Sequence, residues 1–269
     1  MKKIELSTLQ KLQLSVLKEV DRICKKHGIK YYLIGGTLIG AIRHKGFIPW
    51  DDDIDIAMMR LDYDRFIKCS EEELNSKYFI QNYNTDIDFY HALTRICIKG
   101  TFVEDKHTKH LKCHKETYID IFPLDNVPDD EEELKKQKRK ILLVDKILKY
   151  KACILHENGV LYSKFLIKKF LSVILKPISQ RTLYNYRQKY MKKYFGQNTL
   201  RVSSTASKYG FSKQIMLKSI YGDPTMVEFE GGMYPAPQDW EYYLNHLYGN
   251  YMSLPPKDAR MPTSEVYQI

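Results

Sequence analysis

The chain has few features of exported or membrane-embedded proteins. Nowhere do 18 uncharged apolar residues follow one another, so we predict no transmembrane helix. The first residues, Met1-Lys-Lys-Ile-Glu-Leu-Ser, have no apolar segment of a secretory signal. Five cysteines are scattered through 269 residues without a CxxC pair, which argues against a disulfide framework and for a reducing compartment. We therefore expect a cytoplasmic protein.

Acidic residues are absent from one long segment. Between Asn158 and Gly222 the sequence has no Asp or Glu but 13 Lys and Arg residues. The whole chain has a net charge of +10, so the remainder carries −3 and the basic character belongs to this segment. A block of one sign typically faces an anionic partner, such as a membrane surface, a nucleic acid or a phosphate-rich polymer.

Residues 160–176, inside this basic segment, predict an unusually apolar helix. Its polar positions recur every four residues, at Lys164, Lys168, Ser172 and Lys176. Such a helix either packs on the core, with its lysine ammonium groups reaching water, or lies in the interface of a membrane. The sequence leaves both alternatives open. The second predicts peripheral attachment to the inner face of the plasma membrane through an anionic lipid surface.

The rest of the chain predicts an α+β fold. Helical spacing of apolar residues marks 7–27 and 131–150, and Ser7 with Gln10 gives a capping-box pattern at the first helix. Apolar runs predict strands at 29–34, 78–83, 93–98 and 117–121. Hydrophobic residues make up 43% of the chain, which suffices for a sizeable core.

Charge and periodicity divide the chain into three parts. We predict a core over residues 1–150, a basic helical insertion over 151–222, and a C-terminal segment over 223–269 that completes the core.

The most informative feature is one run, from Ile34 to Ile56, that joins a Gly-Gly pair to four aspartates. Alternate side chains of a strand lie on opposite faces. We therefore predict that Asp53 and Asp55 share one face while Ile54 and Ile56 point into the core. Two neighbouring carboxylates repel each other, and a hard divalent cation such as Mg²⁺ would offset that repulsion.

Other polar groups complete a candidate site for phosphate chemistry. The Gly35-Gly36 turn before a predicted helix at 37–44 offers backbone N–H groups to a phosphate. Asp120 lies between two isoleucines, in the same pattern as Asp53, and is the expected third carboxylate of a two-metal site. Asp125 follows a proline turn and is the less favoured ligand. Cations between the turn and the carboxylates come from Arg43, His44 and Lys45.

These motifs together resemble known proteins. The Gly-Gly pair, Asp53-Ile-Asp55 and Ile119-Asp120-Ile121 are similar to the nucleotidyltransferase superfamily of the DNA polymerase β type. The run from Gly36 to Ile56 resembles more closely the LicD family, which includes phosphocholine transferases and fukutin-type ribitol-phosphate transferases. Tyr118 to Asp125 resembles a second block of that family, and Leu247 to Arg260 its last block.

The resemblance implies a mixed sheet flanked by helices and an enzyme that transfers a phospho-alcohol from a CDP-activated donor to a glycan hydroxyl, with release of CMP. Phosphocholine from CDP-choline is the favoured group, and the acceptor would be a teichoic acid, lipopolysaccharide or capsule precursor. It implies that Asp53, Asp55 and Asp120 hold Mg²⁺ or Mn²⁺ and carry catalysis. The implied donor contacts are Gly35, Gly36, Thr37, Arg43, Lys45 and Trp50.

Several of these residues also have ordinary structural interpretations. Arg43 and Lys45 would be typical surface residues, and Asp120 a strand-end cap. Asp51 has the same parity as Asp53 and is a further candidate ligand, whereas Asp52 is expected to face away or cap a turn.

Two side-chain clusters leave alternatives open. Trp50, Trp240 and Tyr251 are candidates for an aromatic cage around a quaternary ammonium, although core packing is the commoner role. Four possible zinc ligands lie close together, but their spacing fits no zinc pattern and favours a polar loop. These are His107, His110, Cys113 and His114.

Two other functions would use the same features differently. A nucleotidyltransferase would use the same metal ions with an NTP, on RNA or a small molecule, and the basic segment is compatible with RNA. No RNP-type or OB-type pattern accompanies it, so we do not expect a nucleic-acid partner. An inactive binding module would lack a carboxylate, and all three are present. The sequence thus favours the CDP-dependent phosphotransferase, docked through residues 158–222.

Overall fold

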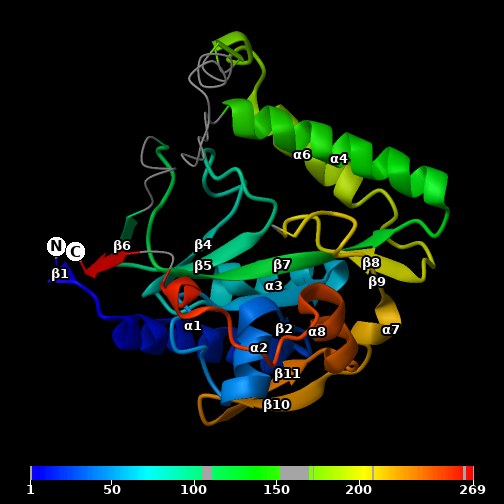
Figure 1. Cartoon of the computed structure of the whole chain (residues 1–269). Helices are drawn as coiled ribbons and strands as arrows, with labels where there is room; N and C mark the ends of the chain where they lie inside the picture. Colours follow the sequence, from blue (N-terminus) through cyan, green and yellow to red (C-terminus); the bar gives the residue numbers. More distant parts are fainter. Residues whose placement is uncertain are drawn as a thin grey trace.

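The computed structural model of the chain describes residues 2–104, 111–151, 170–171, 173–207, 209–262 and 265–268. A mixed sheet of seven strands lies at its centre (Figure 1). The main strand order is β2-β3-β7-β5-β4, and β8 and β9 continue from one end of β7. The strands are β2 (Tyr32–Leu33), β3 (Asp55–Met59), β4 (Tyr78–Gln81), β5 (Thr94–Ile98), β7 (Tyr118–Val127), β8 (Arg201–Ser203) and β9 (Met216–Leu217).

Only one pair of strands in this sheet is parallel. β3 and β7 run in the same direction, whereas the other pairs in the sheet are antiparallel. Helices α1 (Leu6–His27) and α3 (Arg60–Glu73) contact β3 or β7, and Figure 1 shows the paired helices α4 (Glu131–Lys151) and α6 (Gln180–Met191) on the other side of the sheet. The predicted mixed sheet with flanking helices is confirmed.

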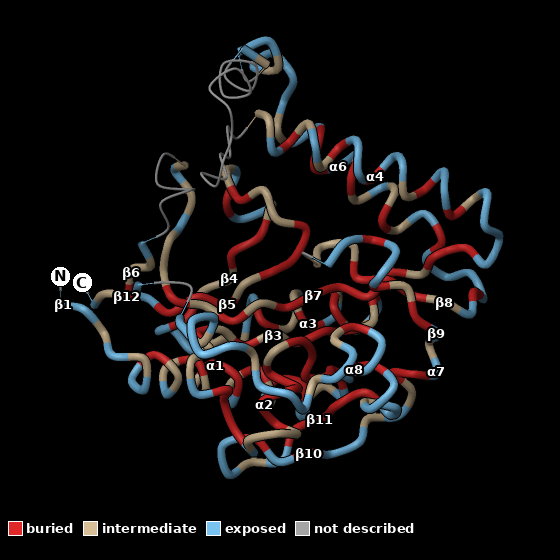
Figure 2. The backbone as a smooth tube through the Cα atoms, viewed as in Figure 1, coloured by how far each residue is buried: buried red, intermediate tan, exposed pale blue. Residues whose placement is uncertain are grey.

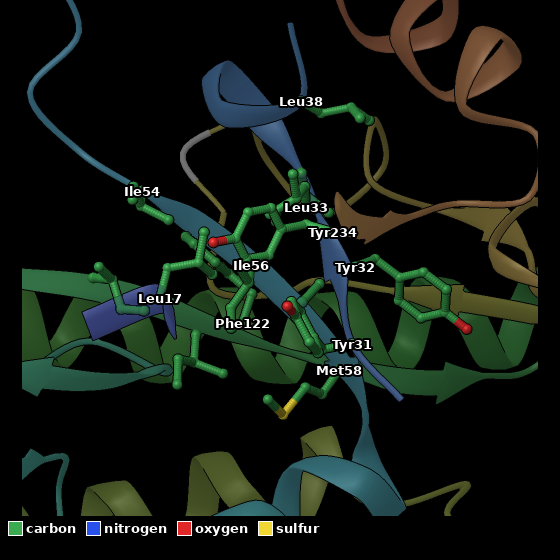
Figure 3. Close-up of a cluster of buried hydrophobic side chains, with 14 of the residues drawn as sticks. Leu17, Tyr31, Tyr32, Leu33, Leu38, Ile54, Ile56, Met58, Phe122 and Tyr234 are labelled. Atoms are coloured by element: carbon green, nitrogen blue, oxygen red, sulfur yellow. The ribbon is translucent and has the colours of Figure 1, made fainter. Parts of the chain in front are cut away.

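The core face of β3 follows the predicted alternation. Ile54, Ile56 and Met58 are all fully buried, and Figure 3 shows them among the side chains of Leu17 from α1 and Phe122 from β7. Each such side chain contributes about 1.5–3 kcal/mol when it leaves water. The buried positions in Figure 2 concentrate along these central strands. One detail was wrong: β3 begins at Asp55, so Asp53 lies in the segment that leads into the strand.

The first helix is confirmed, but its predicted capping box is wrong. α1 begins at Leu6, and its N-cap residue Glu5 makes no side-chain cap bond. Gln10, the expected capping partner, instead donates its amide to the carbonyl of Asp51 over 3.0 Å. The helix ends, as predicted, at Gly28, which adopts the left-handed conformation with φ of 59°.

Part of the basic segment is neutralised by acidic residues of the core. Lys192 bonds Asp64 over 2.7 Å, Lys193 bonds Glu133 over 2.9 Å, and Arg201 bonds Glu131 over 2.7 Å. Exposed pairs of this kind are individually weak, but together they fasten α6 and β8 to α3 and α4. The segment predicted as a separate basic insertion also supplies two strands, β8 and β9, to the central sheet.

The predicted apolar helix at 160–176 lies mostly outside the described residues, which include neither 160–169 nor 172. At its described end, Phe170, Val173 and Ile174 are more than half exposed, at 65%, 55% and 53%. These apolar side chains face solvent instead of the core. No helix in the described parts of the chain has the length and apolar character needed to cross a bilayer.

The C-terminal segment packs against α2 (Gly35–His44) and strand β2. It follows α7 (Lys218–Tyr221) and contains the hairpin β10 (Thr225–Phe229) and β11 (Gly232–Ala236), α8 (Trp240–Tyr248) and η1 (Lys257–Ala259). Its last strand, β12 (Glu265–Gln268), pairs with β1 (Lys2–Lys3) and β6 (Thr101–Glu104), which brings both ends of the chain together.

A buried ion pair connects α3 to the end of β7. Arg60 and Asp125 are 3% and 1% exposed and share two short bonds, Nε–Oδ1 at 2.6 Å and Nη2–Oδ2 at 2.7 Å. Asp125 is thus committed to the core, in agreement with its low rank as a metal ligand.

We expect Asp125→Ala to lower the free energy of unfolding by about 3–5 kcal/mol, because it leaves the Arg60 charge buried without its partner. Urea denaturation followed by circular dichroism measures this. The control is Glu132→Ala, which removes one member of the exposed pair with Lys135 and should change stability by no more than about 0.5 kcal/mol. Equal effects of the two variants would contradict the structural role of Asp125.

Candidate active site

Strand register brings two acidic side chains together at the centre of the sheet. Asp55 on β3 lies directly opposite Asp120 on β7, and the Asp120 N–H donates to the Ile54 carbonyl over 2.9 Å. Neighbouring strands are about 4.8 Å apart, so the two carboxylates occupy adjacent positions on one face. Their chain neighbours Ile56 and Ile121 are paired on the opposite, buried face. The predicted proximity of Asp55 and Asp120 is therefore observed.

The glycine pair lets the start of α2 approach these carboxylates. Gly35 has φ of +60°, and a Cβ at this position would lie 2.9 Å from the Asp55 Oδ2 atom. A Cβ on Gly36 would lie 2.8 Å from Oδ2 of Asp51. The Thr37 hydroxyl accepts a hydrogen bond from the Asp55 N–H over 2.8 Å. The predicted Gly-Gly turn is wrong in detail, because both glycines already belong to the first turn of α2.

Three consecutive aspartates gather their side chains in the segment before β3. Carboxylate oxygens of Asp51, Asp52 and Asp53 lie within 4.8 Å of one another. The expectation that Asp52 faces away is wrong: it is only 8% exposed and joins the cluster. These three residues offer only oxygen ligands, which suits a hard divalent cation such as Mg²⁺ or Mn²⁺, whereas Asp55 and Asp120 are not members of this group.

A side chain of helix α1 holds the aspartate segment through hydrogen bonds to backbone carbonyls. The side-chain amide of Gln13 donates to the Asp52 carbonyl over 2.8 Å and to the Tyr118 carbonyl over 3.2 Å, and is 2% exposed. One buried side chain thus connects the segment before β3 to the start of β7. Sequence reasoning missed this role, although a glutamine on the apolar face of a helix was a visible signal.

Arg95 on β5 is the main residue that the sequence analysis overlooked. It lies opposite Asp120 in the β5–β7 register, and its Nε donates to Asp120 Oδ1 over 2.8 Å. Its guanidinium carbon lies 3.5 Å from the ring centroid of Tyr118. Burial lowers the pKa of Arg95, but the charges of Asp120 and Tyr118 outweigh burial and raise it overall. The cation therefore stays charged and offsets the repulsion between Asp55 and Asp120.

Tyr118 lies in the field of the same carboxylates. Burial raises the pKa of its phenol, Arg95 opposes this, and the negative charges of Asp120, Asp53 and Asp55 raise it further. All three residues predicted as catalytic thus raise the pKa of one phenol through their charges.

The remaining predicted donor contacts lie near α2. Arg43 donates to the carbonyls of Tyr251 and Ser253 over 2.7 and 3.3 Å and so holds the C-terminal tail. Lys45 is exposed and follows α2 with φ of 59°. Trp50 is partly buried, with the Arg260 guanidinium 5.5 Å from its ring. Contact of Arg43, Lys45 and Trp50 with a donor stays a prediction.

Two alternatives from the sequence have different outcomes. Trp50, Trp240 and Tyr251 pack against the main core, as expected of most such residues. Of the possible zinc ligands, His107 and His110 lie outside the described residues, while Cys113 and His114 lie beside a cavity described below.

We expect Gly35→Ala to weaken Mn²⁺ binding about 10- to 100-fold, because the new methyl group displaces the Asp55 carboxylate. The matched control is Gly28→Ala, since Gly28 has nearly the same φ but a Cβ there would meet no atom within 4 Å. Both variants should lose about 1–2 kcal/mol of stability from the left-handed backbone. Electron paramagnetic resonance titration with Mn²⁺ checks the difference. Equal affinity in the two variants would contradict a cation at Asp55.

Comparison with known proteins agrees with the position of this site. Residues 28–140, which include all the carboxylates above, match the family model described as LicD/FKTN/FKRP, nucleotidyltransferase domain. The chain is 34% identical over 265 residues to the lipopolysaccharide cholinephosphotransferase LicD of Haemophilus influenzae, an alignment that covers 97% of each protein. Ribitol 5-phosphate transferase FKRP of Homo sapiens is 41% identical over 49 residues, 17% of this chain and 10% of that protein. The chain belongs to the LicD family.

Proposed function

We propose that this protein is a cholinephosphotransferase that moves phosphocholine from a CDP-activated donor to a hydroxyl group of a lipopolysaccharide or a related cell-surface glycan. The main support is the similarity to the Haemophilus influenzae enzyme, which extends over 97% of both chains and includes the carboxylate site. The site itself supports phosphoryl transfer, because it combines clustered carboxylates with a glycine-rich helix start. The mixed sheet with these motifs also supports a nucleotidyltransferase-type fold.

In the proposed reaction, the acceptor oxygen attacks the phosphorus that carries choline. A bond forms between these atoms, and the bond from phosphorus to the bridging oxygen breaks, so that CMP leaves with the electron pair. The Asp120 carboxylate takes the proton of the acceptor hydroxyl. Arg95 holds Asp120 in place through the 2.8 Å bond from its Nε. The N–H groups of Gly36 and Thr37 at the start of α2 would face the diphosphate, which is the usual position for a phosphate at a helix N-terminus, whereas the Gly35 N–H donates to the Tyr243 hydroxyl over 3.3 Å.

Asp53, Asp55 and Asp120 would hold the divalent cations, with Asp51 close by. Mg²⁺ or Mn²⁺ bound there would neutralise charge on the transferred phosphoryl group and on the departing phosphate. The support for a cation at these carboxylates is the close approach of Gly35 to Asp55 and of Gly36 to Asp51. A side chain at either glycine would collide with the carboxylate.

We expect Asp53→Asn and Asp55→Asn each to lower turnover of CDP-choline by at least about 1,000-fold, since cation stabilisation of the transition state is worth several kcal/mol. CMP release and mass spectrometry of a lipopolysaccharide acceptor measure the reaction, and EDTA should abolish it. The melting temperature should stay the same or rise, because the variants remove repulsion between carboxylates. The control is Asp223→Asn, at an aspartate whose side chain is 89% exposed. Near-normal turnover in either variant would contradict the assignment.

We further propose that the protein attaches to the inner face of the plasma membrane through residues 158–222. Support comes from the exposed apolar side chains of Phe170, Val173 and Ile174 within a segment that has no acidic residue. Apolar contact and attraction to anionic lipid then act together.

Vesicle flotation tests this attachment. We expect the protein to bind vesicles with 30% phosphatidylglycerol several-fold better than pure phosphatidylcholine vesicles, roughly in line with 1 kcal/mol for each basic residue near the surface. The double variant Phe170→Ser, Ile174→Ser should lose most of this binding, while the matched pair Leu142→Ser, Leu143→Ser on exposed positions of α4 should keep it. Equal binding to both vesicle types would contradict the proposal.

A further inference from the structure

A small cavity adjoins the carboxylate site. It has a volume of about 90 Å³, and its walls include three aromatic rings (Phe89, Tyr90 and Tyr118), two histidines (His91 and His114), Arg95 and Glu116. At roughly 30 Å³ per water molecule, this is room for one compact group of a few heavy atoms. None of the aromatic residues that the sequence analysis considered for a cage lines this cavity.

Strand geometry connects the cavity to the reacting carboxylates. Asp120, Tyr118 and Glu116 are separated by steps of two residues along β7 and the segment before it, so they follow one face. Each step covers about 7 Å.

The cavity wall carries charged residues of both signs, namely Arg95, Lys115 and Glu116. Beside Asp120, Arg95 uses its Nε for that carboxylate, and its other nitrogens have no hydrogen-bond acceptor among the described residues. The Oε2 atom of Glu116 is buried without a hydrogen-bond partner, while Oε1 lies 3.5 Å from the His114 ring. A buried carboxylate oxygen without a partner is costly, and a cation placed beside it offsets its charge.

Two of the aromatic rings already hold a cation, because Arg95 lies over Tyr118 and Phe89, at 3.5 and 5.2 Å from the ring centroids. Tyr90 is the third aromatic ring of the cavity wall. The ring of His91 lies 4.0 Å from that of Tyr90. Burial and the nearby charges of Arg95, Arg187 and Lys149 hold the pKa of His91 well below its usual value, so its ring adds no positive charge.

We propose that this cavity binds the choline head group of the donor, with its quaternary ammonium between Tyr90 and Glu116 and its phosphate beside Arg95. The inference rests on the proposed cholinephosphotransferase function and assigns the part of the site that selects the alcohol. A quaternary ammonium donates no hydrogen bonds and is held by aromatic faces and a nearby carboxylate.

The test is a comparison of two donors by isothermal titration calorimetry with the full chain. CDP-choline has a quaternary ammonium, and CDP-glycerol has a neutral head group on the same nucleotide. We expect the wild type to bind CDP-choline at least about tenfold more tightly, and Glu116→Gln and Tyr90→Leu each to lose most of that preference. Affinity for CDP-glycerol should change less than about twofold. Glu132→Gln, at an exposed glutamate, is the control and should keep the preference.

The outcomes separate this inference from the proposed function. If the wild type transfers phosphocholine and both variants keep its preference for CDP-choline, the assignment of the cavity is wrong and the proposed function stands. Equal weakening of CDP-choline and CDP-glycerol would also overturn the assignment, because it would indicate general damage to the site. If the wild type neither binds CDP-choline nor transfers phosphocholine, both proposals fail.

Discussion

The parallel pairing of β3 with β7 is the constraint on which the site depends. It sets Asp55 directly beside Asp120, and the same register buries Ile56 and Ile121 on the other face. A shift of one residue would exchange the two faces, placing carboxylates in the core and isoleucines in the site. The burial of the isoleucines thus stabilises the register that brings the two negative charges together. This stabilisation outweighs the repulsion between the carboxylates.

Other elements stabilise the carboxylates that this register brings together. Arg95 arrives from β5 on the far side of Asp120 and supplies a charge of the opposite sign. Gln13 fixes the backbone of the aspartate segment from α1, so the carboxylates can converge without the freedom to move apart. The first turn of α2 comes close enough that a Cβ on Gly35 would lie 2.9 Å from an Asp55 oxygen. These contacts hold the carboxylates in a fixed arrangement of the kind that electrostatic catalysis requires.

Much of this arrangement could be predicted from the sequence, because local patterns determine it. Alternation indicated which side chains of the run from Asp53 to Ile56 face the core, and the flanking isoleucines identified Asp120 as the partner of Asp55. Local patterns carry no information about Arg95, since its role arises only from the order of strands in the sheet. Local patterns also predicted the wrong partner for Gln10. Its side chain was expected to cap α1, but its amide donates to the carbonyl of Asp51, which is distant along the chain. The contacts that sequence reasoning missed are those between residues distant along the chain.

The same reasoning explains why local patterns gave no sign of the aromatic cavity. Trp50 lies next to the aspartates in sequence, yet it packs against the core, whereas Tyr118 is distant in sequence and lies one strand step from Asp120. Members of a family that transfer different alcohols need the same carboxylates, because the phosphoryl chemistry is the same. Selection must then come from groups beyond the phosphate. In the proposed arrangement, these groups are those of the cavity that Arg95 and Glu116 line. Changes at such wall positions can alter the alcohol without altering the register that supports catalysis.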